Sequence, residues 1–119
     1  MNWIEKQTDE YETFWHITPR ENIESILKNG LKQSVTGANS EGVYGIKANS
    51  FEQTQLHNVI NFMELNGFAK DDLVIIEFEH LGNYYINEAG KIYLDDGWIT
   101  IKKDIPINLI DKILEFEEI

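Results

Sequence analysis

The clearest pattern of hydrophobic and polar positions lies near the start of the chain, where a strand turns directly into a helix. Residues 14–17 carry aromatic and β-branched side chains typical of a strand. Thr18 followed by Glu21 predicts a capping box, with Pro19 at the favoured first helical position. The chain is therefore expected to change from strand to helix between Thr18 and Pro19.

Two amphipathic helices are predicted in the first half of the chain. The first should end at Gly30, and the second should begin after Ser50, which forms a capping box with Gln53, and stop at Gly67. Leu31 and Phe68 then fold back onto the last turns. The predicted buried stripes are Ile23, Ile26 and Leu27 in the first helix and Leu56, Val59, Ile60 and Met63 in the second.

The remaining apolar runs predict strands, at 43–46, 73–78, 84–86, 91–94, 98–102 and, as an edge strand, 113–116. Residues 105–110 predict a tight turn or one helical turn. Residues 1–12 are mostly polar, and we expect them to form a lead-in that packs only locally before a single domain at 13–119. Two early helices followed mainly by strands predict an α+β fold, with the helices packed on a split, mostly antiparallel β-sheet.

Composition places the chain among cysteine-free globular proteins. Its 119 residues suffice for one hydrophobic core, and 42% of them are apolar. No apolar run is long enough to cross a membrane, and the first residues lack the features of a signal peptide. The absence of cysteine excludes disulfides and thiolate chemistry. A cytoplasmic location without membrane attachment is expected.

The net charge of −11, from 21 acidic and 10 basic residues, argues against direct binding to a nucleic-acid backbone. Such a balance usually indicates only a well-solvated surface. The alternative is an acidic surface that docks on a basic, nucleic-acid-binding partner protein and occupies its site.

His16 is the first candidate for function, because it lies where a strand end opens onto a helix N-terminus. Free backbone N–H groups at such a place favour anionic ligands such as phosphate. The alternative is a half-buried histidine that shares a hydrogen bond with Thr18. His57, beside Leu56, has no second metal-type ligand nearby and is interpreted as an ordinary helix histidine. Gly45, inside a predicted strand, indicates either a β-bulge or the close approach of a ligand or another backbone.

The order of these pieces resembles the ADP-ribosyltransferase fold. Four stretches carry the resemblance: Phe-Trp-His-Ile-Thr at 14–18, Asn-Ile-x-x-Ile-Leu-x-x-Gly-Leu at 22–31, Gly-Val-Tyr-Gly-Ile at 42–46, and the strand from 98 that leads into Ile-Pro-x-x-Leu-Ile-x-x-Ile. The resemblance implies that NAD is bound as substrate. His16 would hydrogen-bond a ribose hydroxyl, Tyr44 would stack on nicotinamide, and Thr18 would lie near the ribose and phosphates.

Breaking the bond between nicotinamide and ribose builds positive charge on the sugar, which a carboxylate can stabilise. In the family a Glu at the start of a late strand has this role, whereas this chain has Gly97 there. Asp96, or Glu88 in the preceding turn, is the candidate acid. The alternative for residues 95–97 is a plain hairpin turn.

The related RNA 2'-phosphotransferases share the fold but rely on several arginines to hold phosphates. This chain has one, Arg20, for which we expect either a pyrophosphate of the ligand or Glu24 as partner. RNA is therefore a poor candidate substrate.

Two functions follow from the resemblance. The first is a small ADP-ribosyltransferase, a glycosyl-transferring enzyme that modifies a protein or small-molecule acceptor. The second is a catalytically inactive member of the fold that acts as an acidic binding module or inhibitor, encoded by a phage or mobile element.

Overall fold

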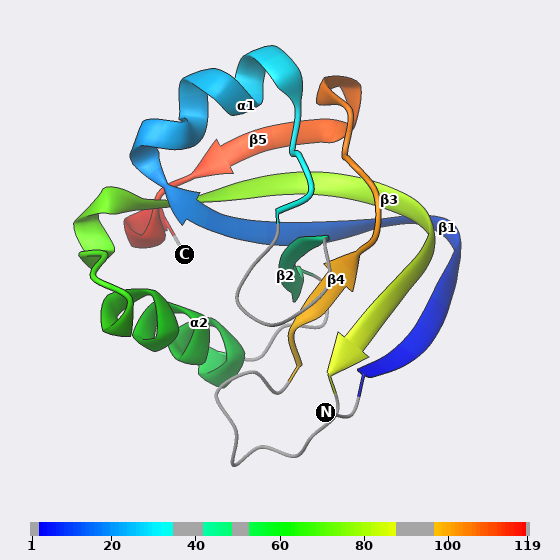
Figure 1. Cartoon of the computed structure of the whole chain (residues 1–119), viewed down its shortest axis with the longest axis horizontal. Helices are drawn as coiled ribbons and strands as arrows, with labels where there is room; N and C mark the ends of the chain where they lie inside the picture. Colours follow the sequence, from blue (N-terminus) through cyan, green and yellow to red (C-terminus); the bar gives the residue numbers. More distant parts are fainter. Residues whose placement is uncertain (1–2, 35–41, 49–52, 88–96, 119) are drawn as a thin grey trace.

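The computed structural model describes residues 3–34, 42–48, 53–87 and 97–118. In these residues, two helices pack against a five-stranded sheet in which all strand pairs are antiparallel (Figure 1). The elements are β1 (Trp3–Pro19), α1 (Ile23–Asn29), β2 (Val43–Lys47), α2 (Gln53–Leu65), β3 (Leu73–Asn87), β4 (Ile99–Ile101) and β5 (Ile110–Leu114). The predicted α+β class with a mostly antiparallel sheet is confirmed.

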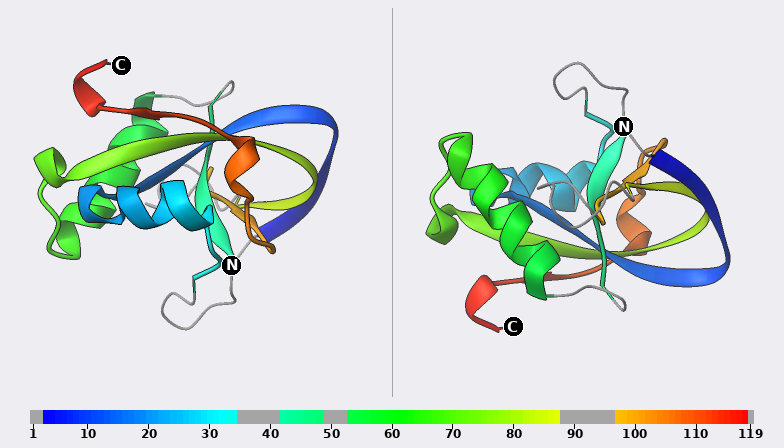
Figure 2. Two further views of the ribbon diagram at one scale, coloured as in Figure 1. Left: turned by 90° about the horizontal axis from the view of Figure 1, so that it is seen from above. Right: turned by 90° about the horizontal axis from the view of Figure 1, so that it is seen from below.

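The longest feature is a two-stranded ribbon of β1 and β3, which pair from Trp3 opposite Asn87 to Pro19 opposite Leu73. A register shift between Thr8 and Glu12 interrupts the pairing, and the ribbon curves away from both helices (Figures 1 and 2). The prediction that residues 1–12 pack only locally was wrong. The separate strand predicted at 84–86 is the last part of β3.

The first four strands close on themselves. The order is β1-β2-β4-β3-β5, and β3 also pairs with β1, so that β5 lies outside the ring on β3. The β1–β2 contact is short: only Phe14 opposite Lys47 and Trp15 opposite Ile46 are paired. Beyond these two residue pairs, β2 pairs with β4 instead. The sheet therefore splits immediately after Trp15.

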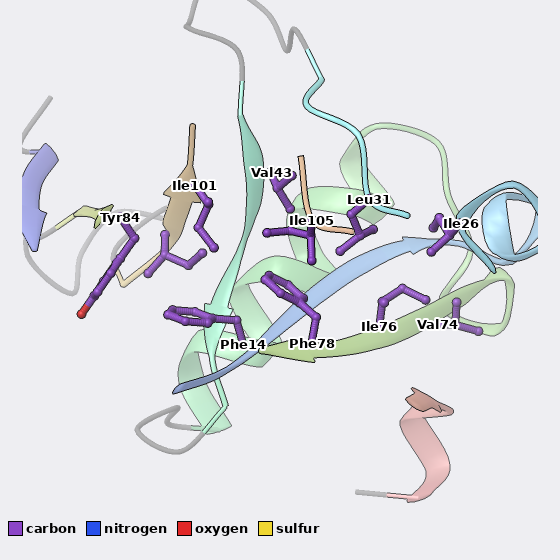
Figure 3. Packing of buried hydrophobic residues seen from close by; sticks show 11 residues of the cluster. Phe14, Ile26, Leu31, Val43, Val74, Ile76, Phe78, Tyr84, Ile101 and Ile105 are labelled. Carbon is purple, nitrogen blue, oxygen red and sulfur yellow. The ribbon is translucent and has the colours of Figure 1, made fainter. Parts of the chain in front are cut away.

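Each face of β1 and β3 carries its own hydrophobic core. One cluster contains Phe14, Phe78 and Tyr84 together with Ile26 of α1 (Figure 3). The Phe14 ring stacks on Phe78 at 5.8 Å between centroids. The cluster on the other face contains the buried side of α2 and the strand residues Trp15, Ile17, Ile46, Leu73 and Ile75. Residues 73–76 and Phe78 are buried, so the strand predicted at 73–78 is covered on both faces.

The start of the first helix differs from the sequence prediction. Residues Arg20–Asn22 form a 3-10 turn before α1, and no side chain caps it. Instead of capping, the Thr18 hydroxyl accepts a hydrogen bond from Asn22 Nδ2 at 2.9 Å. The predicted stop is confirmed: Gly30 has a φ of 78°, and its N–H donates to Ile26 O at 2.8 Å.

The other predictions agree with the structure only in part. Leu27, predicted in the buried stripe of the first helix, is 48% exposed, and in α1 only Ile26 is buried. The edge strand predicted at 113–116 is β5, at Ile110–Leu114. In α2, Leu56, Val59 and Ile60 are buried, and the N–H of Phe68 donates to Met63 O at 3.1 Å, as the predicted fold-back requires. The predicted helical turn near residue 107 is a 3-10 turn at Ile107–Leu109, and β5 is an edge strand. Ser50 and the strand predicted at 91–94 lie outside the described residues. Within the described part of the chain, no helix has the length and apolar character needed to cross a bilayer.

Candidate functional site

His16 lies near the end of β1, where the sheet splits, and its imidazole spans to the neighbouring strand. Its Nδ1 lies 2.5 Å from the backbone carbonyl oxygen of Tyr44, to which it donates. Burial lowers the pKa of His16 below its ordinary value, and the carbonyl only partly opposes that shift. The neutral ring therefore carries its proton on Nδ1 and presents Nε2 as an acceptor. His16 is half-buried as one interpretation expected, but its partner is Tyr44 and not Thr18.

The rings of His16 and Tyr44 leave their strands on opposite faces. Trp15 is paired with Ile46, so these two side chains share a face, and alternation gives Tyr44 the same face and His16 the other. The pairing of His16 with Ile76, which belongs to the Phe14 cluster, agrees with this placement. The two rings therefore do not face each other across one cleft, as direct contact of both with the nicotinamide and ribose of one NAD would require. A backbone carbonyl joins the two residues instead.

Gly45 explains how β2 comes so close to β1. A Cβ atom at this position would lie 2.1 Å from the carbonyl oxygen of Trp15 and 3.3 Å from the Cα of His16. Only a residue without a side chain allows that approach. The expectation that this glycine marks a close contact is confirmed, and the contact is with backbone.

The Tyr44 ring lies on a face rich in aromatic side chains. It is half-buried, and the ring of Trp3 meets it edge-on at 6.3 Å. Thr100 of β4 is directly opposite Tyr44 and is itself opposite Tyr85 of β3. Trp98, two residues before Thr100, follows the same alternation and packs on the α2 side of the sheet. Tyr44, Trp98 and Thr100 form what we call the Tyr44 face.

The other two residues expected to bind NAD are engaged within the protein. Thr18 is buried and accepts the hydrogen bond from Asn22. Arg20 makes a two-pronged ion pair with Glu115, at 2.5 and 2.6 Å, and also donates to the carbonyl of Asp71 at 3.2 Å. The prediction that Glu24 pairs with Arg20 is therefore wrong. Arg20 lowers the pKa of Glu115 mainly through these hydrogen bonds.

An open surface pocket of about 490 Å³ lies beside this ion pair, lined by Arg20, Lys70, Asp71, Leu73, Glu115, Phe116 and Glu117. Both the basic and the acidic side chains of the pocket face the same space. A pyrophosphate there would have to displace Glu115 from Arg20. The pocket is therefore not preorganised to bind an anion.

The two candidate acids, Asp96 and Glu88, lie outside the described residues. Gly97 is described: its φ is 83°, and its N–H donates to the carbonyl of Asn87 at 2.7 Å. A left-handed backbone is unfavourable for a residue with a side chain. This conformation gives a physical reason for glycine where the resemblance implies glutamate. Among the described residues, no group of three acidic or histidine side chains converges as a metal site would require.

Trp98 and Thr100 are the site residues that sequence reasoning missed. Thr100 is a polar residue between the two buried isoleucines of β4, and Trp98 was assigned only to the predicted strand. The signal that could have marked them is the alternation along a strand: residues 98 and 100 lie on the same face, and this is the face of Tyr44. That signal depends on the β2–β4 register, which the sequence alone does not provide.

No protein-family model matches the sequence, and a search of curated proteins finds no match either. A functional proposal therefore depends on the geometry described above and on the motifs in the sequence.

Two histidines, the half-buried His16 and the buried His80, predict how stability depends on pH. Burial lowers the pKa values of both His16 and His80 in the folded chain below the ordinary 6.5. Below that pH the unfolded chain binds more protons than the folded one, so the free energy of unfolding should fall as pH drops from 7 towards 5. The slope is at most about 1.4 kcal/mol per pH unit for each histidine. Urea unfolding at several pH values checks this, and a flat profile would contradict it.

Proposed function

We propose that this chain is a small ADP-ribosyltransferase-like protein that binds NAD, with the nicotinamide end of the ligand against the Tyr44 face. The observation that carries the proposal is the hydrogen bond from His16 Nδ1 to the Tyr44 carbonyl. It joins the two residues that the resemblance assigns to NAD, at the place where the sheet splits. The α+β architecture with antiparallel pairing is compatible with the same proposal.

In this proposal His16 positions Tyr44. A ligand stacked on the Tyr44 ring lies on the far side of β2 from the imidazole, because the two side chains occupy opposite faces. The hydrogen bond fixes the β2 backbone and thereby the Tyr44 ring. The aromatic ring supplies apolar contact area and stacking to the nicotinamide.

The chemistry proposed is transfer of ADP-ribose to an acceptor nucleophile. The bond between the nicotinamide nitrogen and the ribose breaks, nicotinamide leaves, and the acceptor forms a new bond to the same sugar carbon. Positive charge develops on the ribose as the bond breaks, and a nearby carboxylate stabilises it. Asp96 or Glu88 is the proposed carboxylate.

Incubation with NAD and a cell lysate, followed by mass spectrometry, tests the activity. Released nicotinamide or proteins carrying added ADP-ribose would support the transferase. NAD should also raise the melting temperature of the chain, because it binds only the folded state. If NAD causes neither a product nor a thermal shift, the enzyme proposal fails.

Two amide substitutions of His16 separate a positioning role from direct ligand contact. Asparagine places its N–H₂ near the position of Nδ1 and should keep the hydrogen bond to Tyr44, so His16→Asn should retain NAD affinity within about threefold. Glutamine carries its amide near the position of Nε2, so His16→Gln should weaken NAD binding by about tenfold, roughly one hydrogen bond. Calorimetric titration measures both. The reverse order would assign the ligand contact to Nε2.

The second candidate function is an acidic binding module that inhibits a basic, nucleic-acid-binding protein. The observation that favours it is the bend of the β1–β3 ribbon, where Tyr11 and Leu81 are 56% and 41% exposed. Asp9 and Glu10, also exposed, belong to the same bend. Exposed apolar side chains beside carboxylates suit a partner surface that is basic around an apolar centre.

Pull-down from a lysate tests this alternative. A stoichiometric partner released by salt, and lost on Tyr11→Ala with Leu81→Ser, would support it. The variant Leu65→Ser is the matched control, because Leu65 is 76% exposed on α2, outside the ribbon. Retention of the partner by the ribbon double variant would exclude the bend as the docking surface.

A further inference from the structure

Two buried polar groups on the Tyr44 face have no hydrogen-bond partner. Among the described residues, these are the indole Nε1 of Trp98 and the hydroxyl Oγ1 of Thr100. Thr100 as a whole is only 3% exposed. A buried polar group that gives up water without gaining a partner destabilises the folded chain, so such groups are rare and need an explanation.

The surroundings of the two groups are aromatic. Thr100 lies directly opposite Tyr44, and Trp98 is the diagonal neighbour of Tyr44 across the same pair of strands. Phe62 of α2 meets the Trp98 ring edge-on, with centroids 5.0 Å apart and an interplanar angle of 82°. Gly42 of the neighbouring segment lies close against the Thr100 hydroxyl: a Cβ there would lie 2.2 Å from Oγ1, so only glycine leaves room for this hydroxyl.

These observations restrict the chemistry of a ligand. An indole N–H can only donate, whereas a hydroxyl can donate or accept. A neutral amide has one acceptor oxygen and donor N–H groups, and so complements both. A carboxylate would bring a negative charge to a buried face, which is unfavourable unless a cation pairs with it, and the Lys102 ammonium of this region lies over the Tyr85 ring.

We propose that Trp98 and Thr100 form a binding site for the amide group of a planar aromatic ring, with the Trp98 N–H donating to the amide oxygen and the Thr100 hydroxyl accepting from the amide nitrogen. The inference rests on the proposed function in naming nicotinamide as the ring. It adds two ligand-binding residues that no sequence motif marks. It also explains why polar groups persist where apolar ones would stabilise the fold.

Thr100→Val provides the test, because valine replaces the hydroxyl by a methyl group of similar size. If the hydroxyl has no partner in the free protein, the variant should have a higher melting temperature than the parent. The same variant should bind nicotinamide about tenfold more weakly, the equivalent of one hydrogen bond. Thr100→Ser keeps the hydroxyl and should retain binding. Nicotinate, which has a carboxylate in place of the amide, should bind more weakly than nicotinamide.

The outcomes are separable. Nicotinamide binding that depends on Thr100 would support the amide site even if intact NAD did not bind, and the transferase proposal would then fail alone. Equal nicotinamide binding by the parent and Thr100→Val would overturn the amide site, as would no nicotinamide binding by the parent. A higher melting temperature without any effect on binding would show that the hydroxyl is an unsatisfied group without a role in binding, which also overturns the proposal.

Discussion

Replacing Phe14 with alanine should lower the free energy of unfolding by about 3–5 kcal/mol. Phe14 has no exposed surface and joins both long strands to the closed end of the sheet. Its ring stacks on Phe78 and meets Tyr84 edge-on at 5.4 Å and His80 at 6.0 Å. The truncation leaves a cavity among three rings that are themselves held by strand pairing, so the site cannot collapse to fill it. Urea denaturation with a linear extrapolation measures the loss.

Leu65→Ala is the matched control for this prediction. Leu65 is apolar but 76% exposed at the end of α2, so its truncation should change stability by no more than about 0.5 kcal/mol. A loss at Phe14 as small as the loss at Leu65 would mean that the β1–β3 core is not packed as described.

Gly45→Ala should destabilise the chain by about 2–3 kcal/mol and also weaken NAD binding. The added methyl group would overlap the Trp15 carbonyl at 2.1 Å, and both partners are backbone, so neither can move aside as a flexible side chain would. β2 must then shift away from β1, which breaks the hydrogen bond from His16 to the Tyr44 carbonyl. Urea unfolding and calorimetric NAD titration provide the two measurements.

Gly67→Ala separates this steric effect from the ordinary conformational cost of replacing glycine. Gly67 has a φ of 94° but open space around it, so alanine there should cost about 1–2 kcal/mol through backbone strain alone. Since Gly67 follows the end of α2 and an added Cβ there would meet nothing within 4 Å, NAD affinity should not change. Equal losses of affinity in the two variants would show that Gly45 has no specific role.

Local sequence signals predicted correctly where the helices end. Gly30 and Gly67 end α1 and α2 because only glycine adopts their left-handed backbone without cost. The length of β1 was not predictable in the same way. Its residues 3–12 are mostly polar and mostly exposed, and the register shift after Thr8 disrupts the alternation that would have marked a strand.

The candidate site was predictable only in part, because it depends on pairing between distant strands. The motifs brought attention to His16 and Tyr44, and the structure joins them by a hydrogen bond. Which face each ring occupies follows from the pairing of Trp15 with Ile46, a long-range register that local patterns do not contain. Arg20 illustrates the same limit: its partner, Glu115, is 95 residues away, whereas helical spacing suggested Glu24.

An NMR titration of the nitrogen-labelled chain with NAD tests the central claim most directly. The chain has three tryptophans, so its spectrum should contain three indole N–H signals. Trp15 Nε1 already donates to Glu77 Oε1 at 3.0 Å, whereas Trp98 Nε1 has no partner. NAD bound on the Tyr44 face should shift the Trp98 signal strongly and leave the Trp15 signal in place. A Trp98 signal that does not move at millimolar NAD would contradict the account.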